Sequence, residues 1–319
     1  MKVLLTGGNG QLGIALKNEF TEIGQIYEVV STDYDTLDIT NFEQVKEYLI
    51  ANKVDIVINC AAHTAVDKCE EEIERAYQIN AIGPRNLAIV CEQIGAKIVQ
   101  VSTDYVFDGE FNTLEAKQVG LEDVLQSRIE KAKFSQPWRE DDKVAPQSIY
   151  GTSKLMGEEL VRTLCKKHFI IRTAWLYGEG NNFVRTMLKL AQTNKELNVV
   201  GDQFGNPTYA KDLALAIVNL IQTEYYGVYH GTCEGTCSWY DFATKIFELK
   251  GIDVKVNKVT SEQFVRPAKR PFYSSLDNFM LKIQGLNTFR SWQEALADYL
   301  EADAEWQEEN LGGKVNGKN

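Results

Sequence analysis

The sequence is poor in the residues that build metal sites and disulfide frameworks. It has three histidines and six cysteines among 319 residues, and the cysteines are scattered along the chain. Cys233 and Cys237 are close in sequence, but no second pair and no clustered histidine accompanies them, so we predict no zinc site. Cys60 and Cys91 lie in apolar runs, which is typical of small core residues.

Long apolar runs and an excess of positive charge are also lacking. No stretch approaches the ~18 uninterrupted apolar residues of a membrane-spanning helix, and the chain begins with a strand-like run rather than a basic segment followed by an apolar one. The net charge of −11 argues against nucleic acid or an anionic membrane as a partner, although it leaves an anionic small ligand open. We therefore expect a protein of a reduced, cytoplasmic compartment.

The residues that are present indicate an ordinary globular protein. The hydrophobic fraction is 44% and the charged fraction is 25%, and the length fits one or two domains. Short apolar runs that are typical of buried parallel strands alternate with helical patterns. This alternation predicts an α/β fold, with a doubly wound parallel sheet and a smaller C-terminal α/β substrate domain.

A glycine-rich turn stands between the first predicted strand, residues 2–6, and the first predicted helix. Gly7, Gly10 and Gly13 are spaced G-x-x-G-x-x-G. In dinucleotide-binding turns the first glycine allows the tight turn, the second lets a pyrophosphate approach the backbone, and the third lets the helix pack on the strand. The phosphates would then lie at a helix N-terminus. The strand before the turn and the helix after it favour a Rossmann-type nucleotide site over a plain glycine turn.

Asp33 follows the second predicted strand, residues 26–32, about 20 residues beyond the glycine turn. An acidic residue at this place commonly binds the adenosine ribose hydroxyls and disfavours a 2′-phosphate. Tyr34, and not Arg or Lys, comes next. The pattern favours NADH over NADPH, and the alternative is an aspartate that caps a turn.

Tyr150 and Lys154 are spaced four residues apart within a predicted helix. Residues at this spacing share one helix face, roughly 5–6 Å apart at their Cβ atoms. A nearby cation favours the phenolate of a tyrosine and so makes the phenol a better proton donor. The pair therefore suits a general acid that protonates a developing alkoxide, and the alternative is an unrelated Tyr and Lys on a solvated helix face.

Ser102 and Thr103 follow the predicted strand at residues 97–101. In an open parallel sheet, ligands bind beyond the carboxyl ends of the strands. A hydroxyl there can hydrogen-bond a substrate carbonyl and share a proton with Tyr150, whereas the alternative is a residue that caps a turn.

Six blocks in this order resemble the extended short-chain dehydrogenase/reductases and, within them, the dTDP-4-dehydrorhamnose reductase family. They read LLTGGNGQLG, NCAAHTAVDKCE, VSTDYVFDG, YGTSKLMGE, IIRTAWLYGEGNNF and GDQFGNPTYAKDLA. Several blocks in one order are far more specific than any single motif. The resemblance implies NAD(P)H-dependent reduction of the 4-keto group of a nucleotide-linked 6-deoxy sugar, with dTDP-4-dehydro-L-rhamnose to dTDP-L-rhamnose as the expected reaction.

The resemblance also implies the roles of individual residues. Thr103, Tyr150 and Lys154 are the expected catalytic set. The implied cofactor-binding residues are Gly7, Gly10, Gln11, Leu12, Gly13, Asp33, Asp38, Ile39, Cys60, Ala61, Ala62, Tyr150 and Lys154. The implied substrate-binding residues are Thr64, Val66, Asp67, Thr103, Trp175, Asn182 and Arg270. For Trp175 core packing is the alternative, while Arg270 belongs to a basic patch at residues 266–271 that suits a diphosphate.

The blocks divide the chain into expected domains. Residues 1–176 and about 209–232 form the dinucleotide-binding domain, residues 177–208 and 233–307 form the substrate domain, and 308–319 form a disordered tail. Residues 110–138 depart from the family by their length. Val124, Leu125 and Ile129 fall near helical spacing, so we expect an inserted surface helix and loop, either over the sugar site or as a solvated decoration.

Metal and partner expectations also come from the resemblance. Some relatives hold a divalent cation at the subunit interface through a glutamate early in the first helix. Residues 13–16 carry no carboxylate here, so we predict no metal site. A homodimer and a dTDP-linked sugar substrate are expected.

Two other functions stay open at this point. The same scaffold supports sugar-nucleotide 4-epimerases, 4,6-dehydratases and reductases that give the other C4 epimer. A regulatory subunit of methionine adenosyltransferase also resembles this family, but that function predicts a degraded active site, whereas Thr103, Tyr150 and Lys154 are all present.

Overall fold

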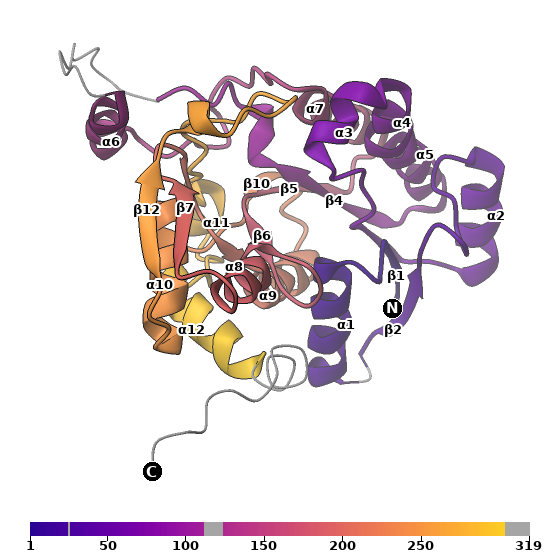
Figure 1. Ribbon diagram of the computed structural model, residues 1–319. Helices are drawn as coiled ribbons and strands as arrows, with labels where there is room; N and C mark the ends of the chain where they lie inside the picture. Colours follow the sequence, from indigo (N-terminus) through magenta and orange to yellow (C-terminus); the bar gives the residue numbers. More distant parts are fainter. Residues whose placement is uncertain (25, 112–123, 304–319) are drawn as a thin grey trace.

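The computed structural model describes residues 1–24, 26–111 and 124–303, and its centre is a sheet of six parallel strands (Figure 1). The strands are β1 Lys2–Thr6, β2 Glu28–Thr32, β3 Ile56–Asn59, β4 Lys97–Thr103, β5 His168–Thr173 and β10 Gly227–His230. Their order is β10-β5-β4-β3-β1-β2. β1 pairs with β2 on one side and with β3 on the other, so the chain crosses over β1 between these two strands. In open α/β sheets, ligands bind at such a switch point.

Both faces of this sheet are covered by helices because its strands are apolar on both sides. Along β1, Val3 and Leu5 face α1 Gln11–Ile23 and α9 Ala210–Ile221, while Leu4 faces α2 Phe42–Asn52, α5 Gly83–Ile94 and α7 Ile149–Leu164. Side chains that alternate between the faces explain these two separate cores. The predicted doubly wound parallel sheet is confirmed.

A smaller C-terminal region packs against one edge of this layered body. It contains short strand pairs and the helices α8 Phe183–Ala191, α10 Trp239–Lys250, α11 Phe279–Ile283 and α12 Trp292–Ala302. The strand pairs are β6 Leu176–Tyr177 with β9 Thr208–Tyr209, β7 Glu196–Val200 with β12 Lys255–Val259, and β8 Phe204–Gly205 with β11 Cys237–Ser238. The predicted smaller α/β region is therefore present.

The helical stretch at residues 73–94 is interrupted. It divides into α4 Ile73–Tyr77, a π-helical turn Gln78–Ile82 and α5, and a short helix, α3 Val66–Glu71, precedes it. Asn80 lies in the π-helical turn, where its side chain accepts from His63 N (2.8 Å) and donates to Ser153 Oγ (3.1 Å). Such turns are frequent at functional sites, and this one anchors the segment after β3 to α7.

The expected insert contains a helix, α6 Val124–Phe134, which lies at the outer side of the C-terminal region near β12 (Figure 1). Arg128 of this helix pairs with Asp202 and Glu262 and places its guanidinium 4.1 Å from the ring of Phe272. The predicted helix is thus confirmed. Residues 112–123 of the insert and the predicted tail at 308–319 lie outside the described residues. Within the described ranges, no helix combines the length and apolarity needed to cross a membrane.

Candidate active site

A cavity of about 1160 Å³ opens along the carboxyl ends of the main sheet. It extends from the glycine turn, past β4 and α7, to Trp175, Trp239 and Pro271 of the C-terminal region. Every predicted cofactor-binding residue lines it: Gly7, Gly10, Gln11, Leu12, Gly13, Asp33, Asp38, Ile39, Cys60, Ala61, Ala62, Tyr150 and Lys154. Thr64, Val66, Thr103 and Trp175, from the predicted substrate set, line it too. The structure therefore gathers residues from distant segments into one continuous site.

The glycine turn has the geometry expected of a phosphate cradle. Gly7 has a φ of +65°, which favours glycine. A Cβ added to Gly13 would lie 2.6 Å from the carbonyl oxygen of Gly7, so α1 packs on the turn more closely than another residue allows. Gly10 precedes α1, whose N-cap has no side-chain hydrogen bond. The first backbone N–H groups of α1 can therefore bind an anion.

Asp33 and Asp38 both hold backbone at the cavity wall. Asp33 Oδ2 accepts from Asn9 N at 2.9 Å, which ties the glycine turn to the end of β2. Asp38 Oδ1 accepts from the backbone and the hydroxyl of Thr40 at 2.9 and 2.7 Å. Each carboxylate thus has a local structural contact in addition to its place at the cavity.

The helix that carries Tyr150 and Lys154 begins close to the 3-10 turn Asp104–Val106, which follows β4. Ser148 caps α7 by accepting from Gly151 N at 3.1 Å. A Cβ added to Gly151 would lie 2.2 Å from the carbonyl oxygen of Tyr105, so a larger residue here would push α7 away. The glycine directly after Tyr150 therefore allows the phenol to reach the end of β4, where Thr103 lies.

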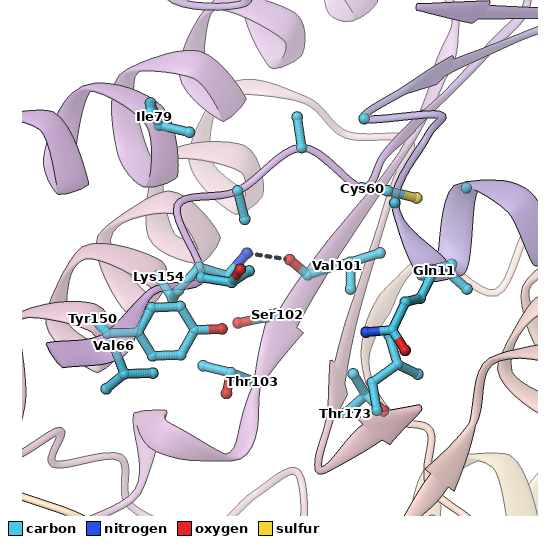
Figure 2. A pocket seen from close by; sticks show the side chains of 18 of the residues that line it. Gln11, Cys60, Val66, Ile79, Val101, Ser102, Thr103, Tyr150, Lys154 and Thr173 are labelled. Carbon is cyan, nitrogen blue, oxygen red and sulfur yellow. Dashed lines mark hydrogen bonds between the residues drawn. The ribbon is translucent and has the colours of Figure 1, made fainter. Parts of the chain in front are cut away.

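Tyr150 and Lys154 are both buried at the cavity wall, beside Ser102 and Thr103 (Figure 2). Burial raises the pKa of Tyr150 above its usual range, the nearby Thr103 hydroxyl lowers that pKa, and the charge of Asp104 raises it again. The phenol is therefore protonated at neutral pH. Burial lowers the pKa of Lys154 to about 8, against the effects of Glu158 and Cys60. Its Nζ donates to the carbonyl oxygen of Val101 at 2.6 Å.

Thr103 is held by its neighbours on the turn after β4. Its Oγ1 donates to Asp104 Oδ1 at 2.9 Å and accepts from Tyr105 N at 3.3 Å. Burial raises the pKa of Asp104 to about 6, although hydrogen bonds from Ser274 and Thr103 lower it. The structure thus fixes the hydroxyl that faces Tyr150.

Three predicted substrate residues do not line the cavity. Asp67 and Arg270 pair with each other, with 2.7 Å between Oδ2 and Nη2, and Arg270 Nη1 donates to Tyr105 Oη at 3.1 Å. They lie at its border, since Tyr105 and Pro271 line it. Asn182 caps α8 by accepting from Arg185 N at 3.0 Å, and its amide donates to Gly178 O at 2.6 Å.

Trp175 has both packing and a place at the cavity. Its indole stacks on that of Trp239, with ring centroids 3.5 Å apart and planes within 7°. Trp175 also has a φ of +46°, a conformation that bulky residues rarely adopt and that often marks functional sites. The sequence prediction did not include Trp239, because nothing in the pattern around it distinguishes it from a core aromatic residue.

Further residues of the site also went unpredicted. Glu158 and Arg172 are two of these, and they form a buried network with Ser102 between the Tyr150 helix and the sheet. The one signal for it in the sequence is that Glu158 follows Lys154 by one helical turn. Gln11 Oε1 and Thr173 Oγ1 are buried without a hydrogen-bond partner among the described residues, and both side chains line the cavity (Figure 2). Buried polar atoms are normally paired, so these two fit a bound polar group such as a nicotinamide carboxamide.

Comparisons with known proteins agree with this geometry. Residues 1–305 match the family model described as RmlD substrate binding domain. The spore coat polysaccharide biosynthesis protein SpsK of Bacillus subtilis is 43% identical over 301 residues, which cover 94% of this chain and 97% of that protein.

Two solved structures of dTDP-4-dehydrorhamnose reductases are similar over nearly their full length. The one from Clostridium acetobutylicum is 50% identical with a TM-score of 0.85, and the match covers 95% of this chain and 99% of that one. The one from Bacillus anthracis, solved in complex with NADP, is 41% identical with a TM-score of 0.83. This match covers 94% of this chain and 99% of that one. The chain therefore belongs to the RmlD substrate-binding domain family and is an NAD(P)-dependent sugar-nucleotide reductase of the dTDP-4-dehydrorhamnose reductase type.

Proposed function

We propose that this protein reduces the 4-keto group of dTDP-4-dehydro-L-rhamnose to give dTDP-L-rhamnose. One observation carries the proposal: Thr103, Tyr150 and Lys154 converge in a cavity that is continuous with the glycine turn on one side and with Trp175 on the other. A dinucleotide and a sugar nucleotide can therefore meet at these three side chains.

Tyr150 is the general acid in this mechanism. The phenol carries its proton at neutral pH and can transfer it to the developing C4 oxyanion, but burial, which raises the pKa of Tyr150, makes it a weaker acid unless a cation stabilises the phenolate. Thr103 orients the carbonyl through its hydroxyl. Lys154, whose Nζ donates to Val101 O, would also bind the nicotinamide ribose and would stabilise the phenolate that remains after transfer.

The residues of the glycine turn and the strand ends would hold the cofactor. Gly7 and Gly10 would let the pyrophosphate approach the backbone, and Gly13 lets α1 pack on the turn. Gln11 and Thr173 would offer the carboxamide the two oxygens that have no partner among the described residues. The bound nicotinamide would supply the hydride. Asp33 suggested a preference for NADH, but the similar reductase from Bacillus anthracis was solved with NADP. The proposed reaction therefore uses either NADH or NADPH.

Asp67, Arg270 and Trp175 would hold the sugar nucleotide. A diphosphate can replace Asp67 as the partner of Arg270, because guanidinium binds phosphate and carboxylate in the same geometry. The aromatic face of Trp175 suits a sugar ring, and its stack with Trp239 keeps that face in position.

A steady-state assay tests the proposal. Oxidation of NADH and of NADPH is followed with a dTDP-4-keto-6-deoxy sugar, and the product stereochemistry is determined by NMR. We expect turnover that depends on the keto sugar and a product with the L-rhamno configuration. An epimerised or dehydrated product would assign a different reaction, and a partner captured without any oxidation would favour a regulatory subunit.

A second candidate function follows from one of the relatives. The 43% identity with SpsK favours a related nucleotide sugar that supplies a spore coat polysaccharide. The same product analysis distinguishes the two, because it identifies the sugar and the configuration at C4.

A further inference from the structure

A cluster of buried charges lies directly behind the proposed catalytic pair. Lys154, Glu158 and Arg172 are exposed by only 3%, 2% and 5%. Buried charges are costly unless they are paired and hydrogen-bonded. The proposed mechanism uses Lys154 but leaves the other two without a role.

Glu158 joins three elements through one carboxylate. From β5, Arg172 donates to it through Nε at 3.1 Å and Nη2 at 2.8 Å. From β4, Ser102 Oγ donates to its Oε1. Glu158 itself follows Lys154 by one turn of α7, so the two side chains share a helix face. The carboxylate therefore connects the Tyr150 helix to two neighbouring strands of the sheet.

These contacts hold the strand end that presents Thr103. Lys154 Nζ donates to Val101 O at 2.6 Å, and Glu158 accepts from the hydroxyl of Ser102, the next residue. Thr103 follows immediately. Two successive residues of β4 are thus fixed to α7 just before the hydroxyl that faces Tyr150.

We propose that Glu158 is a positioning residue for the reduction. Its carboxylate fixes the Thr103 strand end against the Tyr150 helix, and its negative charge lies one helical turn from the buried Lys154 ammonium. This inference rests on the proposed function, because it needs the Tyr150 and Lys154 mechanism.

The charges around Lys154 determine the expected pH dependence. Burial lowers the pKa of Lys154 to about 8, while Glu158 from α7 and Cys60 from the end of β3 raise it. Arg172 neutralises Glu158 from the far side and itself faces His230 of β10 and the ring of Phe107. Activity that needs the ammonium is present below the pKa of Lys154 and is lost as the pH rises through it. Removal of the Glu158 charge therefore moves this loss to lower pH.

The test is the pH profile of kcat/KM for the keto sugar at saturating NADPH. For Glu158→Gln we expect the midpoint of the alkaline fall to move down by about one pH unit, together with a lower kcat. Ser102→Ala removes one strand contact and no charge, so it should lower kcat severalfold and leave the midpoint unchanged. A wild-type profile and wild-type kcat in Glu158→Gln would overturn the inference, as would an equal shift in Ser102→Ala.

A second variant keeps the inference testable where Glu158→Gln folds poorly. Glu158→Gln leaves the buried Arg172 without its charged partner, and loss of one member of a buried ion pair lowers the stability of the fold. Glu158→Asp keeps the negative charge on a shorter side chain, so it should lower kcat and leave the midpoint near its wild-type value. A midpoint that moves down by about one pH unit in this charge-conserving variant overturns the inference. Lack of turnover by the wild-type protein would instead reject the proposed function itself, so the two failures are distinguishable.

Discussion

Arg270 and Asp67 join the C-terminal region to the sheet body at the border of the cavity, with 2.7 Å between guanidinium and carboxylate. Ala268 N also donates to Asp67, at 3.3 Å, so the same carboxylate holds the backbone of this loop. A substrate diphosphate would compete with Asp67 for the guanidinium.

Replacement of Arg270 tests this contact. Arg270→Met should raise the KM for the nucleotide sugar about 10–100-fold, because a hydrogen bond to a charged group contributes about 1.5–3 kcal/mol. The affinity for NADPH, measured by fluorescence titration, should not change. Lys269→Met is the matched control, since Lys269 pairs with Glu110 at 3.1 Å and does not line the cavity. Equal effects from both variants would contradict the assignment.

The phenol of Tyr150 should be required for proton transfer and not for binding. Tyr150→Phe is expected to lower kcat by about 10²–10⁴-fold, the usual contribution of a general acid. The affinity for NADPH should equal that of the wild type within experimental error. The substitution keeps the ring and its edge-to-face contact with Tyr105, in which the centroids are 5.5 Å apart. Wild-type turnover in this variant would reject the mechanism.

The helix of the insert should contribute to stability through Arg128. This residue pairs with Asp202, which is fully buried, and with Glu262, which is half-exposed. Arg128→Met should lower the free energy of unfolding in urea by about 1–3 kcal/mol, because Asp202 loses a charged partner. The exposed Lys131→Met serves as the control. In a double-mutant cycle, Arg128 and Glu262 should couple by no more than about 1 kcal/mol.

His230 should make the protein less stable in acid. Burial lowers its pKa from 6.5 to about 3, and its Nδ1 lies 3.0 Å from the carbonyl oxygen of Trp138. The folded state keeps His230 neutral while the unfolded chain takes up a proton below pH 6.5. Stability is therefore lost as the pH falls from 6.5 toward 3, by up to about 1.4 kcal/mol per pH unit.

A variant isolates this contribution. Urea unfolding at about pH 7 and about pH 4.5 should show a smaller pH-dependent loss for His230→Asn than for the wild type. His168→Asn is the comparison: the pKa of His168 is also lowered by burial, but its side chain is only partly buried and we expect a smaller change. Identical pH dependence in the wild type and in His230→Asn would refute the prediction.

Features that depend on local spacing could be predicted from the sequence. The glycine turn could be recognised because its three glycines stand at fixed spacing between a strand and a helix. The period of a helix puts Tyr150 and Lys154 on one face. An asparagine inside a helical stretch is mildly unfavourable, and Asn80 is buried with hydrogen bonds to His63 N and Ser153 Oγ.

Contacts between distant segments could not be predicted in this way. The pairing of Arg128 with Asp202 joins residues 74 positions apart, and no spacing rule relates them. Glu158 resembles any other glutamate on a helix until the sheet brings Arg172 and Ser102 beside it. Asn182 was expected to bind the sugar, but its side chain caps α8. The sequence could not separate these two roles, because asparagine is suited both to hydrogen-bonding a sugar and to capping a helix.

The interleaved path of the chain limits how the cavity can open. After β5 the chain enters the C-terminal region, returns at α9 for β10, and leaves again for β11, so three covalent links in this part of the chain cross between the two regions. A hinge normally concentrates its motion in a few residues of one connection. Here any opening must bend all three links together, and the α6 contacts add a further restraint. Substrate entry should therefore depend on small side-chain and loop movements at the Arg270 border rather than on rotation of whole domains.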